Sequence, residues 1–387
     1  MRIAMQRMPR IVLATAFCAS IALASIALAG GRTGRGRQAP SFDSRAAQTA
    51  PAAAAAQPAA AQPPAGTSTA EIAREVHADE SFLADDALHG RGSATRDEHI
   101  AALFAAAQFQ SLGLAPGGDN GGYIQRAALP SPLPAGLQQR LSRFEDTPRT
   151  ETWNAIAILP GTTSPQNAPP AEVVLLTAHL DHLGMLKPDP AHPAADLIYN
   201  GADDDASGTT AVLTLAHALA SSPPPRRTIV FALFGSEEIG GFGNAAFLAH
   251  PPVPLASIVA NLEFEMIGRP DPAIPPTGPG QDALWLAGFD RSNLGPELSR
   301  HGAHLVPDPH PEQHFFQRSD NYALARQGIV AHTVSSFGLH KDYHRPSDEL
   351  STLDFPHMVN AIASMIEPIR WLANSTFRPA WNAAGRP

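Results

Sequence analysis

The feature that most constrains the fold of this chain is a series of five short acidic or histidine-bearing segments. They read A-H-L-D at 178–181, G-A-D-D-D-A-S-G at 201–208, S-E-E at 236–238, L-E-F-E-M-I-G at 262–268 and D-Y-H at 342–344. Each segment follows or ends an apolar run of the length expected for a buried strand. Because neighbouring parallel strands end at the same edge of a sheet, the series predicts one site at that edge.

Apolar strands alternate with helices through most of the chain. Strands are expected at 153–159, 173–178, 228–234, 258–264, 284–287 and 329–334, and helices at 207–220, 243–249, 294–301 and 321–327. The motif T-R-D-E at 95–98 predicts a helix that begins with a capping box. A last helix has its apolar residues between 358 and 372 on one face, and we expect Pro368 to kink it. The pattern predicts an α/β fold, a three-layer sandwich with a mixed, largely parallel central sheet.

The first 29 residues have the pattern of a secretory signal peptide. Three arginines precede an apolar run at 11–28, and A-L-A at 27–29 supplies a cleavage signal. We expect cleavage after Ala29 and export to the periplasm or the medium; the alternative is a retained membrane anchor. Residues 30–69, rich in Ala, Pro and Gln, predict a flexible linker. A catalytic domain is expected at 70–376 and a tail at 377–387.

Charge and cysteine usage narrow the class of protein further. The formal net charge is −9, and removal of the three leader arginines makes it −12. An acidic chain without basic clusters is a poor partner for nucleic acid or anionic membranes. The single cysteine, Cys18, lies in the leader. A zinc site in the mature chain must therefore use nitrogen and oxygen ligands, which suits a catalytic metal better than a structural one.

The first two segments offer an imidazole and a run of carboxylates. His179 could bind metal with Asp181 behind it to fix its tautomer, although a histidine at a strand end is more often structural. Asp203, Asp204 and Asp205 form a run without a basic neighbour. The alternative is a solvated turn that caps the following helix, but a pair of bridged cations explains the run better, with Asp204 as the bridge.

The next two segments contain two pairs of glutamates. Adjacent Glu237 and Glu238 can take different tasks, because Glu238 can bind metal while Glu237 accepts a proton from water. Glu263 and Glu265 flank apolar residues and need a partner. Strand alternation places both on the same face, so their spacing does not choose between them.

The last segment adds a second imidazole and a phenol. His344 is a candidate ligand, and Tyr343 beside it could donate a hydrogen bond to a developing oxyanion or could be a packed surface residue. Other histidines are interpreted as ordinary surface or supporting residues: His182, His310, His314, His332 and His340.

In order and content the segments resemble those of the M28 family of zinc metallopeptidases, in its bacterial aminopeptidase branch. The resemblance extends from about residue 71 to 372 and includes H-G-R-G at 89–92, G-L-A-P-G-G at 113–118, I-Y-N at 198–200 and R-S-D at 318–320. The interval 127–152 is too short to contain the protease-associated domain that some relatives insert. The resemblance therefore implies a single catalytic domain.

Carried over residue by residue, the resemblance implies two zinc ions. One ion would be held by His179, Asp204 and Glu265, and the other by Asp204, Glu238 and His344. Glu237 would be the general base and Asp181 the acidic residue behind the ligands, and the resemblance also suggests a cis peptide bond after Asp204. Aspartate is commoner in the family where Glu265 stands, but M-I-G at 266–268 favours Glu265 over Glu263. The sequence S-D-N-Y at 319–322 departs from the family's S-D-H-Y.

These expectations combine into one function, the hydrolysis of N-terminal peptide bonds by an exported zinc aminopeptidase. Its partners would be peptides with a free N-terminus. The alternatives are N-terminal glutamine cyclisation, carboxypeptidase action on the same fold, and a catalytically silent receptor-like domain.

Overall fold

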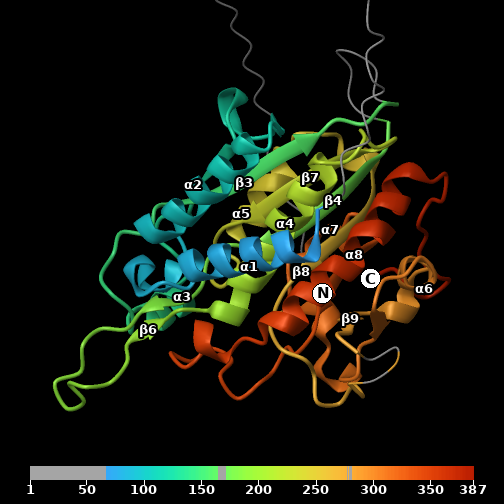
Figure 1. Cartoon of the computed structure of the whole chain (residues 1–387). Coiled ribbons are helices and arrows are strands. Elements are labelled where there is room, and N and C mark those ends of the chain that lie inside the picture. The colour runs from blue at the N-terminus through green and yellow to red at the C-terminus, as the bar shows by residue number, and fades with distance from the viewer. Residues whose placement is uncertain (1–66, 164–170, 277, 279–280) are drawn as a thin grey trace, which may run out of the picture. The chain divides into compact units, whose positions relative to one another are not determined.

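The computed structural model describes residues 67–163, 171–276, 278 and 281–387. The expected leader and nearly all of the expected linker lie outside the described residues, so these two assignments stay predictions. Within the described part, a central sheet is covered by helices on both faces (Figure 1).

Nine strands of the described chain form this sheet. Their order is β1 (Ala115–Pro116), β3 (Glu151–Leu159), β7 (Thr228–Phe234), β4 (Val173–His179), β8 (Ile258–Phe264), β11 (Ala331–Ser335), β9 (Leu284–Leu286) and β10 (Leu305–Pro307), with β2 (Ile124–Ala128) also paired to β3. The central strands β7, β4, β8 and β11 are parallel, while β3 and β9 run antiparallel to their neighbours β7 and β11. The predicted mixed, largely parallel sheet is confirmed. A separate pair of short strands contains β5 (Gly184–Met185) and β6 (Ile198–Tyr199).

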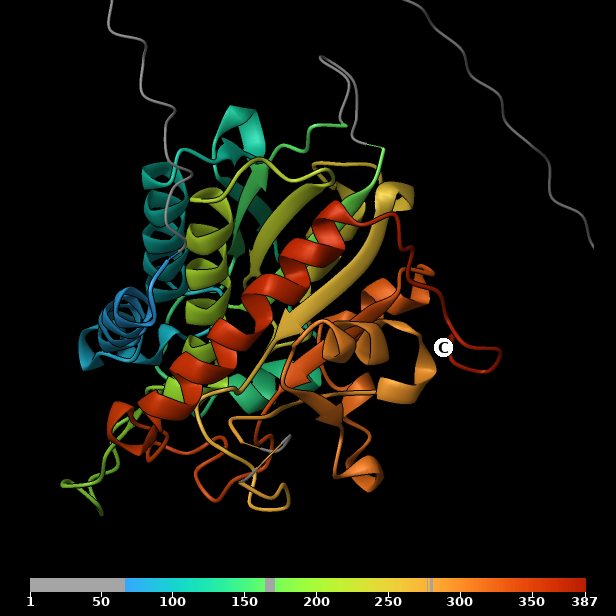
Figure 2. The ribbon, with the colours of Figure 1, turned by 45° about the vertical axis from the view of Figure 1, so that its right-hand side comes forward.

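Alternate residues of the central strands belong to two hydrophobic layers, one on each face of the sheet. Along β7, Ile229 and Phe231 belong to one buried cluster, and Val230 and Phe234 to the other. The first cluster includes residues of α1 (Thr69–Leu83), α2 (Arg96–Ser111), α4 (Gly208–Ala220), α6 (Leu294–Arg300) and α8 (Phe355–Asn374). The second includes residues of α5 (Phe242–Ala249) and α7 (Asn321–Arg326). Figure 2 shows α8 crossing the face of the sheet that also carries α4. The short helix α3 (Ala135–Leu141) has no buried residue.

The boundaries of the helices follow local chemistry. Helix α1 begins at Thr69, the last residue of the expected linker, where Ser68 and Glu71 form a complete capping box. Helix α8 runs from Phe355 to Asn374 with Pro368 inside it, and the expected kink stays a prediction. No helix of the described residues is both long enough and apolar enough to cross a bilayer.

The capping box expected at α2 is only half formed. The Thr95 hydroxyl accepts hydrogen bonds from the N–H groups of Asp97 and Glu98, as predicted. The Glu98 carboxylate, however, turns into the protein and accepts hydrogen bonds from the hydroxyls of Thr152 (2.7 Å) and Ser236 (2.9 Å). Glu98 therefore ties the start of α2 to β3 and to the segment that follows β7, and it also accepts a hydrogen bond from the N–H of Ala94 just before the N-cap.

The expected C-terminal tail packs against the domain. The indole N–H of Trp381 donates to the carbonyl of Gly328 at 3.2 Å, and the N–H of Asn382 donates to the carbonyl of Arg291 at 2.8 Å.

Candidate metal centre

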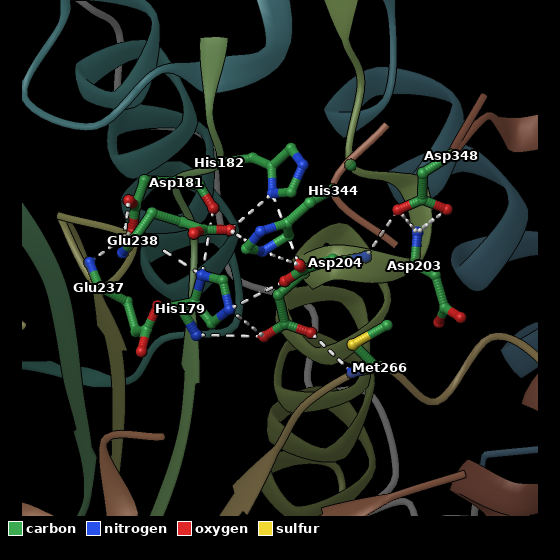
Figure 3. Close-up of polar contacts among 12 residues, drawn as sticks. His179, Asp181, His182, Asp203, Asp204, Glu237, Glu238, Met266, His344 and Asp348 are labelled. Atoms are coloured by element: carbon green, nitrogen blue, oxygen red, sulfur yellow. Dashed lines mark hydrogen bonds and ion pairs between the residues drawn. The ribbon is translucent and has the colours of Figure 1, made fainter. Parts of the chain in front are cut away.

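The predicted site residues meet where the parallel strands end, at their carboxyl ends. His179 is the last residue of β4, Glu238 follows β7, and Glu265 follows β8. Asp204 lies in an irregular helical turn, Ala202–Ser207, directly before α4. His344 comes from the loop after β11, and Figure 3 shows its ring beside Asp204 and Glu238. The single edge predicted from the segment order is therefore observed.

His179, Asp204 and Glu265 form the first cluster. Their ligand atoms lie within 4.8 Å of one another. His179 Nε2 is 3.3 Å from the Asp204 carboxylate, and its ring is buried. His179 Nδ1 lies 3.1 Å from the main-chain carbonyl of Asp181 and 3.8 Å from the Asp181 carboxylate. The carbonyl is thus the nearer partner that can fix the tautomer of His179, a task that the sequence suggested for the carboxylate.

The Asp181 carboxylate supports the other side of the site. It accepts hydrogen bonds from the N–H of Glu237 at 3.0 Å and of Glu238 at 3.4 Å, and from the Ser93 hydroxyl at 2.6 Å. One buried residue therefore positions His179 through its carbonyl and the glutamate pair through its side chain.

The second cluster contains Asp204, Glu238 and two histidines. His344 Nε2 lies 3.1 Å from Asp204 Oδ2 and 3.2 Å from Glu238 Oε1. His182 Nδ1 lies 2.9 Å from the same Glu238 oxygen and 3.8 Å from the same Asp204 oxygen. His182 was interpreted as an ordinary surface or supporting residue. The surface interpretation is wrong, because the side chain is fully buried inside the cluster. The signal in the sequence was its position, three residues after His179 and beside Asp181.

The three consecutive aspartates have three different environments. Asp203 accepts a hydrogen bond from the N–H of Gly268 at 2.7 Å. Asp205 accepts hydrogen bonds from three backbone N–H groups, those of His179 (3.2 Å), Gly208 (3.0 Å) and Met266 (3.1 Å). Asp204 lies within 3.3 Å of the rings of both His179 and His344, and the peptide bond between Asp204 and Asp205 is cis, as the resemblance suggested. Burial raises the pKa of Asp204, but His182, His179 and His344 outweigh this effect and hold the pKa well below its usual range.

An arginine that the sequence reasoning missed connects the aspartates to the His344 loop. The Arg269 guanidinium lies 2.6 Å from Asp342 and from Asp348, and 3.5 Å from Asp203. Asp348 in turn accepts hydrogen bonds of 3.1 Å from the N–H groups of Asp203 and Asp204. The acidic run therefore has a basic partner, although that partner lies more than sixty positions along the chain.

The structure distinguishes the two glutamates at the end of β8. Glu265 contributes to the first cluster. Glu263 is fully buried and accepts a hydrogen bond from the backbone N–H of Asn321 at the start of α7. Burial raises the pKa of Glu263 well above its usual range. Glu263 therefore contacts a neighbouring helix, while Glu265 faces the site.

Glu237 and Tyr343 flank the clusters. Burial raises the pKa of Glu237 well above its usual range, and the nearby Asp320 and Glu238 add to this rise, while His179 opposes it. The Tyr343 ring stacks on His344 with 3.9 Å between ring centroids. Burial and the nearby carboxylates raise the pKa of the Tyr343 phenol, so its O–H stays protonated and can donate.

A pocket opens next to the first cluster. Its lining includes Glu265 and Tyr343 together with Trp285, Phe315 and Arg318. The Arg318 guanidinium lies over the Phe315 ring, 5.2 Å from its centroid. The lining therefore combines three aromatic side chains with polar groups and one exposed cation, Arg318.

An α/β sheet with two overlapping clusters of imidazoles and carboxylates at its strand ends defines a metal-dependent hydrolase centre. The chain belongs to peptidase family M28, whose model matches residues 154–368. The predicted family and enzyme class, a metallopeptidase, are confirmed.

Relatives of known name match only short parts of their own length. Aminopeptidase YwaD of Bacillus subtilis is 31% identical over 109 residues, which are 28% of this chain and 21% of that protein. The probable lipoprotein aminopeptidase LpqL of Mycobacterium tuberculosis is 30% identical over 127 residues, 33% of this chain and 22% of that protein.

Solved structures agree with the fold over most of the described chain. BSAP, a zinc aminopeptidase from Bacillus subtilis, superposes with a TM-score of 0.56 at 16% identity and covers 78% of this chain and 95% of its own. The glutaminyl cyclase of Porphyromonas gingivalis superposes with a TM-score of 0.52 at 15% identity, covering 79% of this chain and 99% of its own.

Proposed function

We propose that this chain is an exported zinc aminopeptidase that holds two zinc ions and removes residues from the free N-terminus of peptides. The observation that carries this proposal is the pair of donor clusters that share Asp204. Export is supported by the leader sequence, and the aminopeptidase activity by the names of the matched relatives.

The donor set suits zinc on two grounds. All donors are imidazole nitrogens or carboxylate oxygens, the ligands of catalytic zinc. In addition, Glu238 Oε1 and both ring nitrogens of His182 are buried without a hydrogen-bond partner among the described residues. Buried polar atoms without a partner are costly, and a bound cation would satisfy those that face it.

The residues would divide between the ions as the family resemblance implies. His179, Asp204 and Glu265 would hold one zinc ion, and Asp204, Glu238 and His344 the other. When bound, the pair would supply an acidified water and polarisation of the scissile carbonyl.

The side chains around the clusters would handle the proton and the developing charge. The Glu237 carboxylate, whose pKa is raised by burial, would take a proton from water and later give it to the leaving amine. The Tyr343 O–H would donate a hydrogen bond to the oxygen on which negative charge develops. Asp181 would keep Glu237 in place through the backbone hydrogen bond of 3.0 Å.

The surroundings of the first cluster favour a substrate with a free amine. A positively charged α-amine would be attracted to the carboxylates of Glu265 and Glu237. The pocket beside Glu265, with Trp285 and Phe315 in its wall, would then receive the side chain of the N-terminal residue.

Glutaminyl cyclisation is the second candidate, because a glutaminyl cyclase shares the fold. Cyclisation would release ammonia from N-terminal glutamine, whereas an aminopeptidase releases the first amino acid. We therefore test the purified chain on glutaminyl and leucyl peptides, with and without a chelator, and measure both products. We expect chelator-sensitive release of free amino acid. Ammonia without amino-acid release would replace the proposal by cyclisation, and the absence of both would overturn it.

A further inference from the structure

His182 occupies a place in the second cluster that the family's ligand set does not use. It follows β4 by three residues, and its ring is fully buried. Figure 3 shows the ring pointing toward the carboxylates of Glu238 and Asp204, on the side of the cluster opposite α4. The backbone of Gly201 packs directly against the ring, since a Cβ atom at that position would come within 2.6 Å of His182 Cγ. The ring is therefore held in this orientation.

His182 Nδ1 lies near two carboxylate oxygens without a well-directed hydrogen bond to either. The nitrogen lies 2.9 Å from Glu238 Oε1 and 3.8 Å from Asp204 Oδ2, and within the described residues it has no hydrogen-bond partner. At 2.9 Å a well-directed donor would form such a bond. The Glu238 oxygen therefore lies away from the in-plane direction of the nitrogen. His182, Asp204 and Glu238 offer ligand atoms within 4.8 Å of one another, so the imidazole is placed where it could bind a metal ion with them.

The distances agree with a common ion. Two ligands at zinc bond lengths and tetrahedral angles are separated by about 3.3 Å. His344 Nε2 lies 3.1 and 3.2 Å from the same two oxygens, and the values for His182 fall on either side of this spacing. The two imidazole rings meet edge to face at 5.6 Å between centroids, so neither blocks the other.

We propose that His182 is a direct ligand of the second zinc ion, which would then have two imidazoles and two carboxylates from the protein. This assignment rests on the proposed zinc enzyme and goes beyond the family's ligand set. The assignment gives the two zinc positions different ligands, because the first cluster supplies only one imidazole and two carboxylates. Nitrogen donors favour the later divalent metals over magnesium and calcium. The second position is therefore expected to load first and to retain zinc longer.

The test is a zinc titration of the metal-free full chain labelled with ¹⁵N-histidine, in which NMR monitors the resonances of the ring nitrogens. We expect three imidazoles to acquire metal-bound nitrogen shifts, and one of them to be the Nδ1 signal that disappears in His182→Gln. If only two imidazoles shift and His182 Nδ1 remains bonded to hydrogen, His182 merely supports Glu238 and the proposal is overturned. Because the count is made on the unsubstituted protein, it does not depend on the folding of the variant.

His332 provides the matched control. It is as buried as His182, but its ring nitrogens contact Ser292 at 2.7 Å and the carbonyl of Ala287 at 2.9 Å. Zinc should leave the His332 signals unchanged, and His332→Gln should leave three shifted imidazoles.

Zinc stoichiometry and peptide hydrolysis are measured on the same sample to separate the two proposals. Three ligating imidazoles without hydrolysis would remove the proposed activity and keep the ligand assignment. Hydrolysis with only two ligating imidazoles would keep the proposed activity and remove the ligand assignment. A chain that binds no zinc would overturn both proposals.

Discussion

The backbone N–H of Glu237 donates a hydrogen bond of 3.0 Å to the carboxylate of Asp181, which lies 56 positions earlier in the chain. This bond joins the end of β7 to the end of β4, at the edge where the donor clusters lie. The position of the proposed base is therefore set by its main chain, and its carboxylate remains free for proton transfer.

Replacing Glu237 by Gln should lower turnover by about two orders of magnitude or more while zinc content stays near two ions per chain. The amide cannot accept a proton, but the backbone bond to Asp181 is kept. Steady-state kinetics on a leucyl peptide and metal analysis of the same preparation check this. Turnover equal to that of the unsubstituted chain would remove Glu237 from the mechanism.

Glu265→Gln and Glu263→Gln form a matched pair of variants two residues apart. Glu265→Gln should weaken the first zinc position and lower activity, because a neutral amide is a poorer ligand. Glu263→Gln should retain both zinc ions, since Glu263 contacts Asn321 at the start of α7. Zinc content after dialysis against a graded chelator distinguishes them, and equal losses from the two variants would contradict the assignment.

Tyr343→Phe tests the proposed oxyanion donor. Removal of one such donor typically costs about 10² to 10³ in kcat, so we expect a loss of that order with little change in KM. The Phe ring can keep the stacking on His344, which lies 3.9 Å away between ring centroids, so zinc content should not change. A rise in KM with kcat unchanged would instead place Tyr343 in substrate binding.

The sequence predicted the sheet and most of the site because both depend on local patterns. Strands β7 and β8 have the residue ranges expected from their apolar runs. The ends of these strands carry Glu238 and Glu265, and the order of the segments brought Asp204 to the same edge. A parallel sheet converts order along the chain into proximity, so the order of the segments was enough to place them at one edge, while the choice of Glu265 over Glu263 came from the family resemblance.

The remaining residues depend on contacts that chain order does not specify. Strand alternation could not separate Glu263 from Glu265, and the hydrogen bond that separates them comes from Asn321, 58 positions later. Likewise, Asp348 bonds to the backbone of Asp203 across 145 positions. His182 was missed for a different reason, since its orientation depends on how the chain turns after β4 rather than on a repeating pattern.

Arg269→Ala should destabilise the fold by about 3–5 kcal/mol, the usual effect of removing one partner from a buried ion pair. The substitution leaves the carboxylates of Asp342, Asp348 and Asp203 without their shared cation. Arg269→Lys keeps the charge but cannot reach all three groups with one planar head, so it should have a smaller effect. Urea unfolding of both variants measures the difference, and equal, small effects would show that the network contributes little.

The last prediction concerns Asp79, a buried residue of α1 that lies away from the proposed ligands in sequence. Burial, with a contribution from Glu75, raises the pKa of Asp79 from 3.8 to about 7. Well below pH 4 the carboxyl is protonated in both the folded and the unfolded state, so it does not affect the pH dependence of stability. As the pH rises from 4 to 7 the unfolded state loses its proton first, and the folded state becomes less stable.

Asp79→Asn should remove this pH dependence. Its gain in unfolding free energy over the unsubstituted chain should grow between pH 4 and pH 7 and then level off, at an upper limit on the order of 4 kcal/mol. Glu75→Gln should give a smaller gain over the same range, because Glu75 is the second cause of the raised pKa. Urea unfolding at a series of pH values checks both variants. A constant offset for Asp79→Asn across this range would mean that Asp79 does not titrate differently in the two states, because only a pKa difference produces a slope.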